Sequence, residues 1–162
     1  MTKIPIIIDI EASGFGKGSY PIEVGIINEV QTTYCSLVRP APGWTHWSEE
    51  SQAIHRISQA TLIKYGKDIV EIATRLNDML YGNVVYSDAW GNDQTWLSYL
   101  FYTANLPQKF KLESIVSLLS EEQMGKWHNA KRDIMLRSDQ QRHRASNDAK
   151  LIQMTYIDVV SG

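Results

Sequence analysis

Two acidic residues near the amino terminus have a spacing that could bind metal ions. Asp9 and Glu11 lie at the end of the apolar, β-branched run that begins at Ile4. Side chains two residues apart in a strand share a face, with their Cα atoms about 7 Å apart. Two ionised carboxylates there repel each other and are costly to remove from water, and a divalent cation between them relieves both penalties. An edge strand with one wet face is the alternative, but the apolar neighbours favour a central strand and a metal site.

A third carboxylate follows a short strand expected over residues 84–86. Asp93 stands three and four residues before Trp96 and Leu97, so on a helix it shares the face that these two side chains turn inward. Two alternatives remain open at this point. Asp93 could be a simple helix N-cap, and Asp88 competes with it for the role of third acid.

A histidine and a fourth carboxylate lie near the carboxyl terminus. On one continuous helix His143 and Asp148 would point about 140° apart. If Ser146 caps the last helix, His143 sits on the preceding loop and can fold back over Asp148 in the first turn. The alternative is an exposed histidine near a capping carboxylate.

These residues must be positioned by strands and helices that the sequence also predicts. Strands are expected over residues 4–10, 22–27 and 32–38, and their short connections indicate an antiparallel meander. Apolar residues then recur at helical spacing from Ile69 to Leu80, and Gly82 ends that helix. Further helices are expected over residues 93–104, over residues 121–136, and after Ser146 through Val159. Three strands followed by alternating helix and strand predict an α/β fold with a mixed sheet.

Taken together, these segments resemble the DEDDh-type 3′–5′ exonuclease superfamily, which includes the proofreading subunit of the bacterial replicative polymerase, ribonuclease T and oligoribonuclease. The family has Asp-x-Glu on its first strand, an Asp at the start of a later helix, and His-x4-Asp near its carboxyl terminus. The resemblance extends roughly from Ile6 to Tyr156. It implies a ribonuclease H-like α/β fold, with a mixed sheet flanked by helices.

The resemblance also implies a reaction and its cofactors. Asp9, Glu11, Asp93 and Asp148 would hold two divalent ions, Mg²⁺ or Mn²⁺, and Asp9 would bridge both. His143 would take a proton from the attacking water. Two-metal sites of this kind hydrolyse phosphodiesters, so the expected products are nucleoside 5′-monophosphates from the 3′ end of single-stranded DNA or RNA.

Several relatives carry a Glu and a His that hold the terminal nucleotide, and Glu50 and His55 have the same spacing here. A histidine that only fixes a loop is the alternative for His55. The chain departs from the family around the third acid, where relatives usually have His-Asn-x3-Phe-Asp and this sequence reads SDAWGND. That departure bears on substrate stacking more than on metal binding.

Size and composition fit a single domain, and the resemblance implies that residues 1–162 are one exonuclease domain. The chain is 43% hydrophobic and 21% charged, and no apolar run is long enough to span a bilayer. No signal peptide is recognised, and Cys35, the only cysteine, is expected to be a small core residue. We therefore expect a cytoplasmic protein with no membrane partner. A homodimer and a protein partner such as a polymerase are left open.

Charge is distributed unevenly along the chain. The formal net charge is −2, yet residues 126–144 contain six lysines and arginines against two aspartates. This basic stretch is either a solvated helix face or a surface that steers phosphate. Trp44 and Trp47 are expected to be exposed and able to stack on bases. The sequence does not choose between DNA and RNA, and a catalytically inactive module that binds nucleic-acid ends or a protein is the alternative function.

Overall fold

The computed structural model describes residues 2–139 and 142–162, and its centre is a mixed β-sheet. In these residues the sheet has five strands in the order β3-β2-β1-β4-β5. The strands are β1 (Ile6–Ala12), β2 (Pro21–Ile27), β3 (Thr33–Leu37), β4 (Val84–Ser87) and β5 (Lys111–Ser114). The first three form the predicted antiparallel meander, while β4 is parallel to β1 and β5 is parallel to β4. Since β1 lies between β2 and β4, the edge-strand alternative for β1 is wrong.

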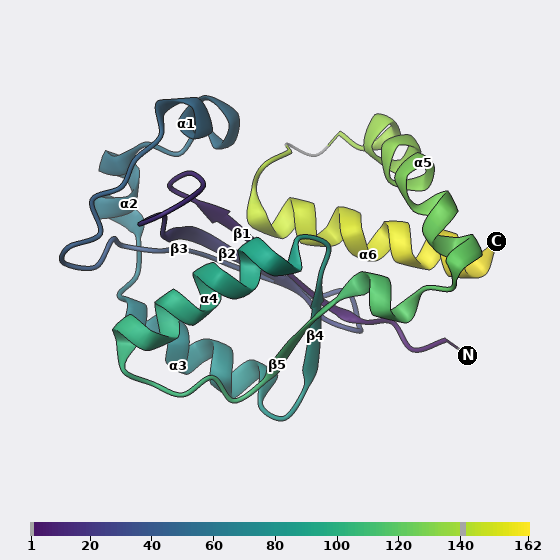
Figure 1. Ribbon diagram of the computed structural model, residues 1–162, viewed down its shortest axis with the longest axis horizontal. Helices are drawn as coiled ribbons and strands as arrows, with labels where there is room; N and C mark the ends of the chain where they lie inside the picture. The colour runs from purple at the N-terminus through teal and green to yellow at the C-terminus, as the bar shows by residue number, and fades with distance from the viewer. Residues whose placement is uncertain (1, 140–141) are drawn as a thin grey trace.

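Helices cover both faces of this sheet (Figure 1). In chain order they are α1 (Glu49–His55), α2 (Gln59–Tyr65), α3 (Ile69–Leu80), α4 (Trp90–Ala104), the 3₁₀ helix η1 (Ile115–Leu118), α5 (Glu121–Arg137) and α6 (Ala145–Ser161). α3 and α4 pack on one face, and α6, with α5 beside it, packs on the other. Among the described residues, no helix has the length and apolar composition needed to cross a lipid bilayer. The predicted α/β fold with a mixed sheet flanked by helices is confirmed.

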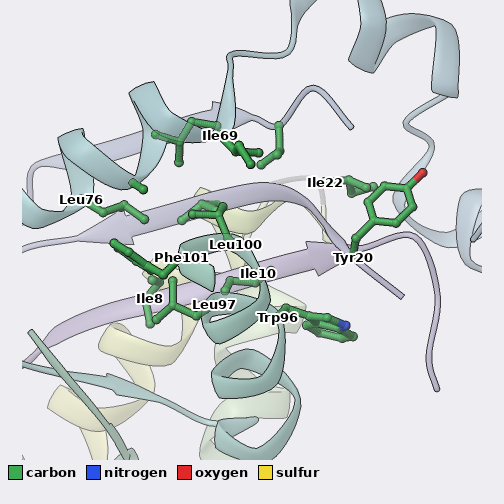
Figure 2. Packing of buried hydrophobic residues seen from close by; sticks show 14 of the residues in the cluster. Ile8, Ile10, Tyr20, Ile22, Ile69, Leu76, Trp96, Leu97, Leu100 and Phe101 are labelled. Atoms are coloured by element: carbon green, nitrogen blue, oxygen red, sulfur yellow. The ribbon is translucent and has the colours of Figure 1, made fainter. Parts of the chain in front are cut away.

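Alternation of side chains along β1 separates two apolar cores. Ile8 and Ile10 pack with α3 and α4 in the larger core (Figure 2). Ile7 points to the other face and packs with α6 in the smaller core. Asp9 and Glu11 continue the face of Ile7, because strand side chains alternate with a period of two. The two carboxylates are therefore directed toward the layer that contains α6.

Two helices begin at residues other than those predicted. α4 begins at Trp90, so Asp93 lies inside its first turn and does not cap the helix. α6 begins at Ala145, and its N-cap residue Arg144 makes no side-chain capping hydrogen bond. The prediction that Ser146 caps this helix is thus wrong, although the consequence drawn from it holds, since His143 still precedes the helix.

Three side chains differ from expectation in their exposure. Cys35 is exposed on β3, which is the edge strand of the meander, and is not a core residue. Trp44, expected at the surface, is only 6% exposed and belongs to the larger core. Trp47 is half-buried, and its indole N–H donates to Gln52. Trp44 is therefore not free to stack on a nucleic acid, and stacking by Trp47 stays a prediction.

Candidate active site

The predicted acids and histidine converge on one pocket. It has a volume of about 320 Å³ and is lined by Asp9, Glu11, Asp93, His143 and Asp148. The site forms where β1 and β4 end, because parallel strands bring their carboxyl ends to the same edge of a sheet. α4 follows β4 and supplies the third acid, and the first turn of α6 supplies the fourth. A larger hollow of about 460 Å³ beside α5 and α6 has Asp158 as its only acidic lining residue among those described.

The two carboxylates of β1 are strongly perturbed by burial and by neighbouring acids. The Oδ2 atom of Asp9 is buried and has no hydrogen-bond partner among the described residues. Burial raises the pKa of Asp9 well above its usual range, and the charges of Asp93 and Glu11 raise it further. Burial, followed by the charge of Asp148, raises the pKa of Glu11 to about 8. Such a cluster is costly to ionise unless a cation compensates it.

The structure separates the two candidates for the third acid. Asp93 is 1% exposed, lines the pocket and accepts a 2.5 Å hydrogen bond from Ser87 Oγ. Burial raises the pKa of Asp93 to about 7, although the hydrogen bond from Ser87 acts in the opposite direction. Asp88 instead forms an ion pair with Lys131 Nζ of α5 at 2.5 Å. It is thus Asp93 that reaches the pocket, while Asp88 joins α5 to the turn after β4.

His143 folds back over Asp148 as the spacing predicts. It has a left-handed backbone, with φ of 60°, and its backbone N–H donates to Asp148 Oδ1 at 3.2 Å. Ligand atoms of Glu11, His143 and Asp148 all lie within 4.8 Å of one another, so this group could hold a metal ion. The ring of His143 is exposed, which leaves it accessible to a substrate.

Half of the basic stretch is engaged in ion pairs with acids in or near the pocket. Arg142 Nε donates to Asp148 Oδ1 at 2.9 Å, and Lys131 holds Asp88. Arg144 binds Glu23, which is fully buried on β2. These three cations offset part of the negative charge around the pocket, so steering of phosphate by the stretch as a whole stays a prediction.

The donor set fits hard divalent cations. It offers carboxylate oxygens from four side chains and one imidazole, and Asp9 contributes a buried oxygen that has no hydrogen-bond partner in the part of the chain that the structure describes. Carboxylate oxygen is the ligand that Mg²⁺ and Mn²⁺ prefer. A bound cation would also remove the repulsion that raises the pKa values of Asp9 and Glu11.

A second histidine presents an unused donor to the pocket. His55, at the end of α1, is 3% exposed, and its Nδ1 accepts the backbone N–H of Ile57 at 3.0 Å. A ring nitrogen that accepts carries no proton, so the neutral ring has its proton on Nε2. Burial favours this neutral form because it lowers the pKa of His55. The buried Nε2 has no partner among the described residues, and the ring lines the pocket.

Helix α1 and the side chain of Phe15 form a further part of the pocket wall. Glu50 is exposed on α1, and the residues of that helix that line the pocket are Ser51, Ile54 and His55. A role for Glu50 in substrate binding stays a prediction. Phe15 also lines the pocket, is 69% exposed, and lies with its ring centroid 5.9 Å from that of Trp96. Its isolation among Gly14, Gly16 and Gly18 was a signal for an exposed aromatic at the tip of a turn.

Comparisons with known proteins agree with this geometry at the level of the fold. No protein-family model and no curated protein matches the sequence. A structure of exonuclease I matches 96% of this chain, with a TM-score of 0.71 at 11% identity, over 40% of its own length. The zinc-bound complex of E. coli ExoI with single-stranded DNA matches 95% of this chain, with a TM-score of 0.68 at 11% identity, over 39% of its length. Exonuclease I from Methylocaldum szegediense matches 75% of this chain, with a TM-score of 0.58 at 15% identity, over 29% of its length.

This chain therefore spans about two fifths or less of the length of these exonucleases. Exonuclease I belongs to the DEDDh 3′–5′ exonuclease superfamily, which is the family that the sequence motifs resemble. At such low identity the likeness establishes the architecture of the chain. The chain has the ribonuclease H-like fold of exonuclease I, as the resemblance of its motifs predicts.

Proposed function

We propose that this protein is a metal-dependent 3′–5′ exonuclease that releases nucleoside 5′-monophosphates from single-stranded DNA or RNA. The observation that carries the proposal is the convergence of Asp9, Glu11, Asp93, His143 and Asp148 on one pocket. These five residues come from segments up to 139 positions apart in the chain, and each belongs to a motif that the sequence alone contains. A buried cluster of acids with raised pKa values is typical of a functional site.

Four carboxylates would hold the metal ions. Asp9, Glu11, Asp93 and Asp148 supply the oxygen ligands that suit two Mg²⁺ or Mn²⁺ ions. When bound, these ions would neutralise the anionic phosphodiester and act as Lewis acids on its oxygens. The protein's own contribution is to exclude water from Asp93 and from the Oδ2 atom of Asp9, which are both buried. In such an environment each electrostatic interaction is stronger than in bulk water.

His143 would act as the general base. Its ring is exposed beside Glu11 and Asp148, and it is attached to a loop rather than to a strand or helix. The neutral imidazole can accept a proton from water at its unprotonated ring nitrogen. Because the backbone N–H of His143 is held by Asp148, the base stays close to one of the proposed metal ligands.

The remaining pocket wall would hold the terminal nucleotide. His55 presents a fixed Nε2–H that can donate to a sugar or phosphate oxygen. This contact would satisfy a buried donor that has no partner within residues 2–139 and 142–162. Phe15 and Ile54 are exposed apolar side chains that line the same pocket. A base could pack against them, since aromatic side chains stack on bases with little dependence on sequence. Glu50 remains in the proposal as a further contact at the edge of α1.

The proposed partner is thus the 3′ end of a single strand, and the proposed setting is the cytoplasm. Exonuclease I structures with a similar fold were solved with single-stranded DNA or short DNA oligonucleotides. We propose that residues 1–162 act as one exonuclease domain. Both DNA and RNA are retained as substrates, and the experiment below decides between them.

The test compares linear and circular single strands. The protein is incubated with 5′-labelled linear DNA or RNA and with circular single-stranded DNA, in Mn²⁺, in Mg²⁺ and in EDTA. We expect metal-dependent shortening of the linear strands by one nucleotide at a time, release of 5′-monophosphates, and intact circles. Cleavage of the circles would contradict an exonuclease. Metal-dependent binding of ends without any cleavage would instead identify the inactive end-binding module.

A further inference from the structure

Glu23 lies at the centre of a buried contact between the sheet and the start of α6. Its side chain is fully buried on β2, directly opposite Glu11 on β1. It accepts hydrogen bonds from Arg144 Nε at 3.1 Å on each oxygen and from Arg144 Nη2 at 2.6 Å. It also accepts the backbone N–H of Ala145, the first residue of α6, at 2.7 Å. One carboxylate from a distant strand therefore binds both the N-cap residue and the first turn of the helix.

Gly25 allows this helix to begin directly on the sheet. A Cβ atom at Gly25 would lie 2.2 Å from the carbonyl carbon of Ala145 and 2.2 Å from the backbone nitrogen of Ser146. No side chain can occupy that space. Gly25 pairs with Asp9 across the two strands, so the start of α6 is pressed against the sheet beside Asp9, whose Oδ2 atom is buried.

The residue before this anchor has an unusual backbone. His143 is in the left-handed region, which residues other than glycine rarely adopt. Such a conformation persists when the surrounding structure determines it. On one side the N–H of His143 is held by Asp148, and on the other Arg144 is held by Glu23. Removing the second contact would leave the chain around His143 free to relax.

We propose that Glu23 and Arg144 are positioning residues that hold His143 in place over the acidic cluster. This inference rests on the proposed function and extends it to two residues that bind neither metal nor substrate. They act through the backbone at the start of α6, which carries His143 on one side and Asp148 on the other. Their loss should slow the chemical step without weakening substrate binding, because a small misplacement of a catalytic group costs rate rather than affinity.

The test uses Glu23→Gln, Arg144→Gln and the double variant in the full chain. Glutamine at position 23 keeps the shape of the side chain but turns an N–H group toward Arg144. We expect kcat to fall by about 100-fold in each single variant, with KM close to that of the wild type. The double variant should be no slower than the slower single variant, because both changes break the same contact. Arg144→Lys retains the charge without the two-pronged geometry, so part of the rate should return. Arg75→Gln, an exposed change on α3, is the control.

A second readout does not depend on cleavage. The backbone amide signals of His143 and Asp148 in ¹H–¹⁵N spectra should shift in both Glu23→Gln and Arg144→Gln and remain in place in Arg75→Gln. If the wild type shows no nuclease activity, the proposed function fails and these signals still decide the positioning role. A folded Arg144→Gln variant with unchanged signals and unchanged kcat would overturn the inference. A raised KM at constant kcat would also overturn it, since Arg144 would then bind substrate directly. If Glu23→Gln does not fold, the two Arg144 variants are sufficient.

Discussion

Replacing Glu11 with glutamine should stabilise the metal-free protein at pH 8. The pKa of this carboxyl is raised from 4.5 to about 8, first by burial and then by the charge of Asp148. The folded protein therefore retains the proton to a much higher pH than the unfolded chain does. Between pH 4.5 and pH 8 the folded state binds more protons, so the free energy of unfolding falls as the pH rises through this window. Glutamine carries no charge at any pH in this window, so the variant lacks this dependence of the free energy of unfolding on pH.

The magnitude follows from the size of the pKa difference. One pKa unit corresponds to ~1.4 kcal/mol, so the change from 4.5 to about 8 amounts to about 5 kcal/mol when the whole window is crossed. A glutamine amide is itself polar and must also be buried, which costs part of this gain. We therefore expect Glu11→Gln to raise the free energy of unfolding at pH 8 by about 2 to 3 kcal/mol. At pH 4 the gain should disappear, because both states of the wild type are then largely protonated.

Urea unfolding followed by tryptophan fluorescence, in EDTA at pH 4, 6 and 8, measures this effect. Glu29→Gln is a matched control, because Glu29 is exposed in the turn after β2, and its effect should stay within about 0.5 kcal/mol. Millimolar Mn²⁺ should stabilise the wild type and have little effect on Glu11→Gln. If Glu11→Gln is no more stable than the wild type at pH 8 in EDTA, ionised Glu11 does not destabilise the folded protein and the raised pKa of Glu11 is refuted.

Three further substitutions test individual residues of the pocket and its support. Asp93→Asn should abolish cleavage while Asp88→Asn retains most of it, as measured by release of labelled nucleotide, and the reverse ranking would mean that Asp88 is the third acid. His143→Ala should lower the rate by about 10²–10⁴-fold and leave the Mn²⁺-induced rise in melting temperature largely intact, whereas a rate close to wild type would remove His143 as the base. Gly25→Ala should lower the free energy of unfolding by about 1 to 3 kcal/mol, because its Cβ would collide with the backbone of Ala145, and unchanged stability in urea would show that α6 can move away at no cost.

Local spacing was enough to predict several features of the pocket. The face shared by Asp9 and Glu11 follows from the period of a strand, and Asp148 falls in the first turn of a helix that starts with a clear change in pattern. The antiparallel meander likewise follows from the short connections between its strands. Each of these features is determined by neighbours in the sequence, so periodicity and turn residues suffice to predict them.

Convergence of the site depends on pairing that local spacing does not encode. Asp93 meets Asp9 because β4 pairs in parallel with β1, and sheet order is a property of the whole fold. α1 and α2 have seven residues each, which is too few to show a clear apolar repeat. Neither helix was therefore predicted, although α1 contributes His55 to the pocket wall. Glu23 was also missed, although it carried a signal. A carboxylate within the fully buried strand β2 needs a partner, and a search for that partner would have led to Arg144.

The cleavage proposed for this pocket requires divalent cations among the carboxylates of Asp9, Glu11 and Asp148. X-ray data collected at the manganese edge from crystals grown in Mn²⁺ would locate such ions directly. We predict anomalous peaks within coordination distance of Asp9 Oδ2 and of the Glu11 and Asp148 carboxylates, and their loss in Asp9→Asn crystals grown under the same conditions. An anomalous map without a peak between these residues, at a Mn²⁺ concentration that supports cleavage in solution, would contradict a metal-dependent site in this pocket.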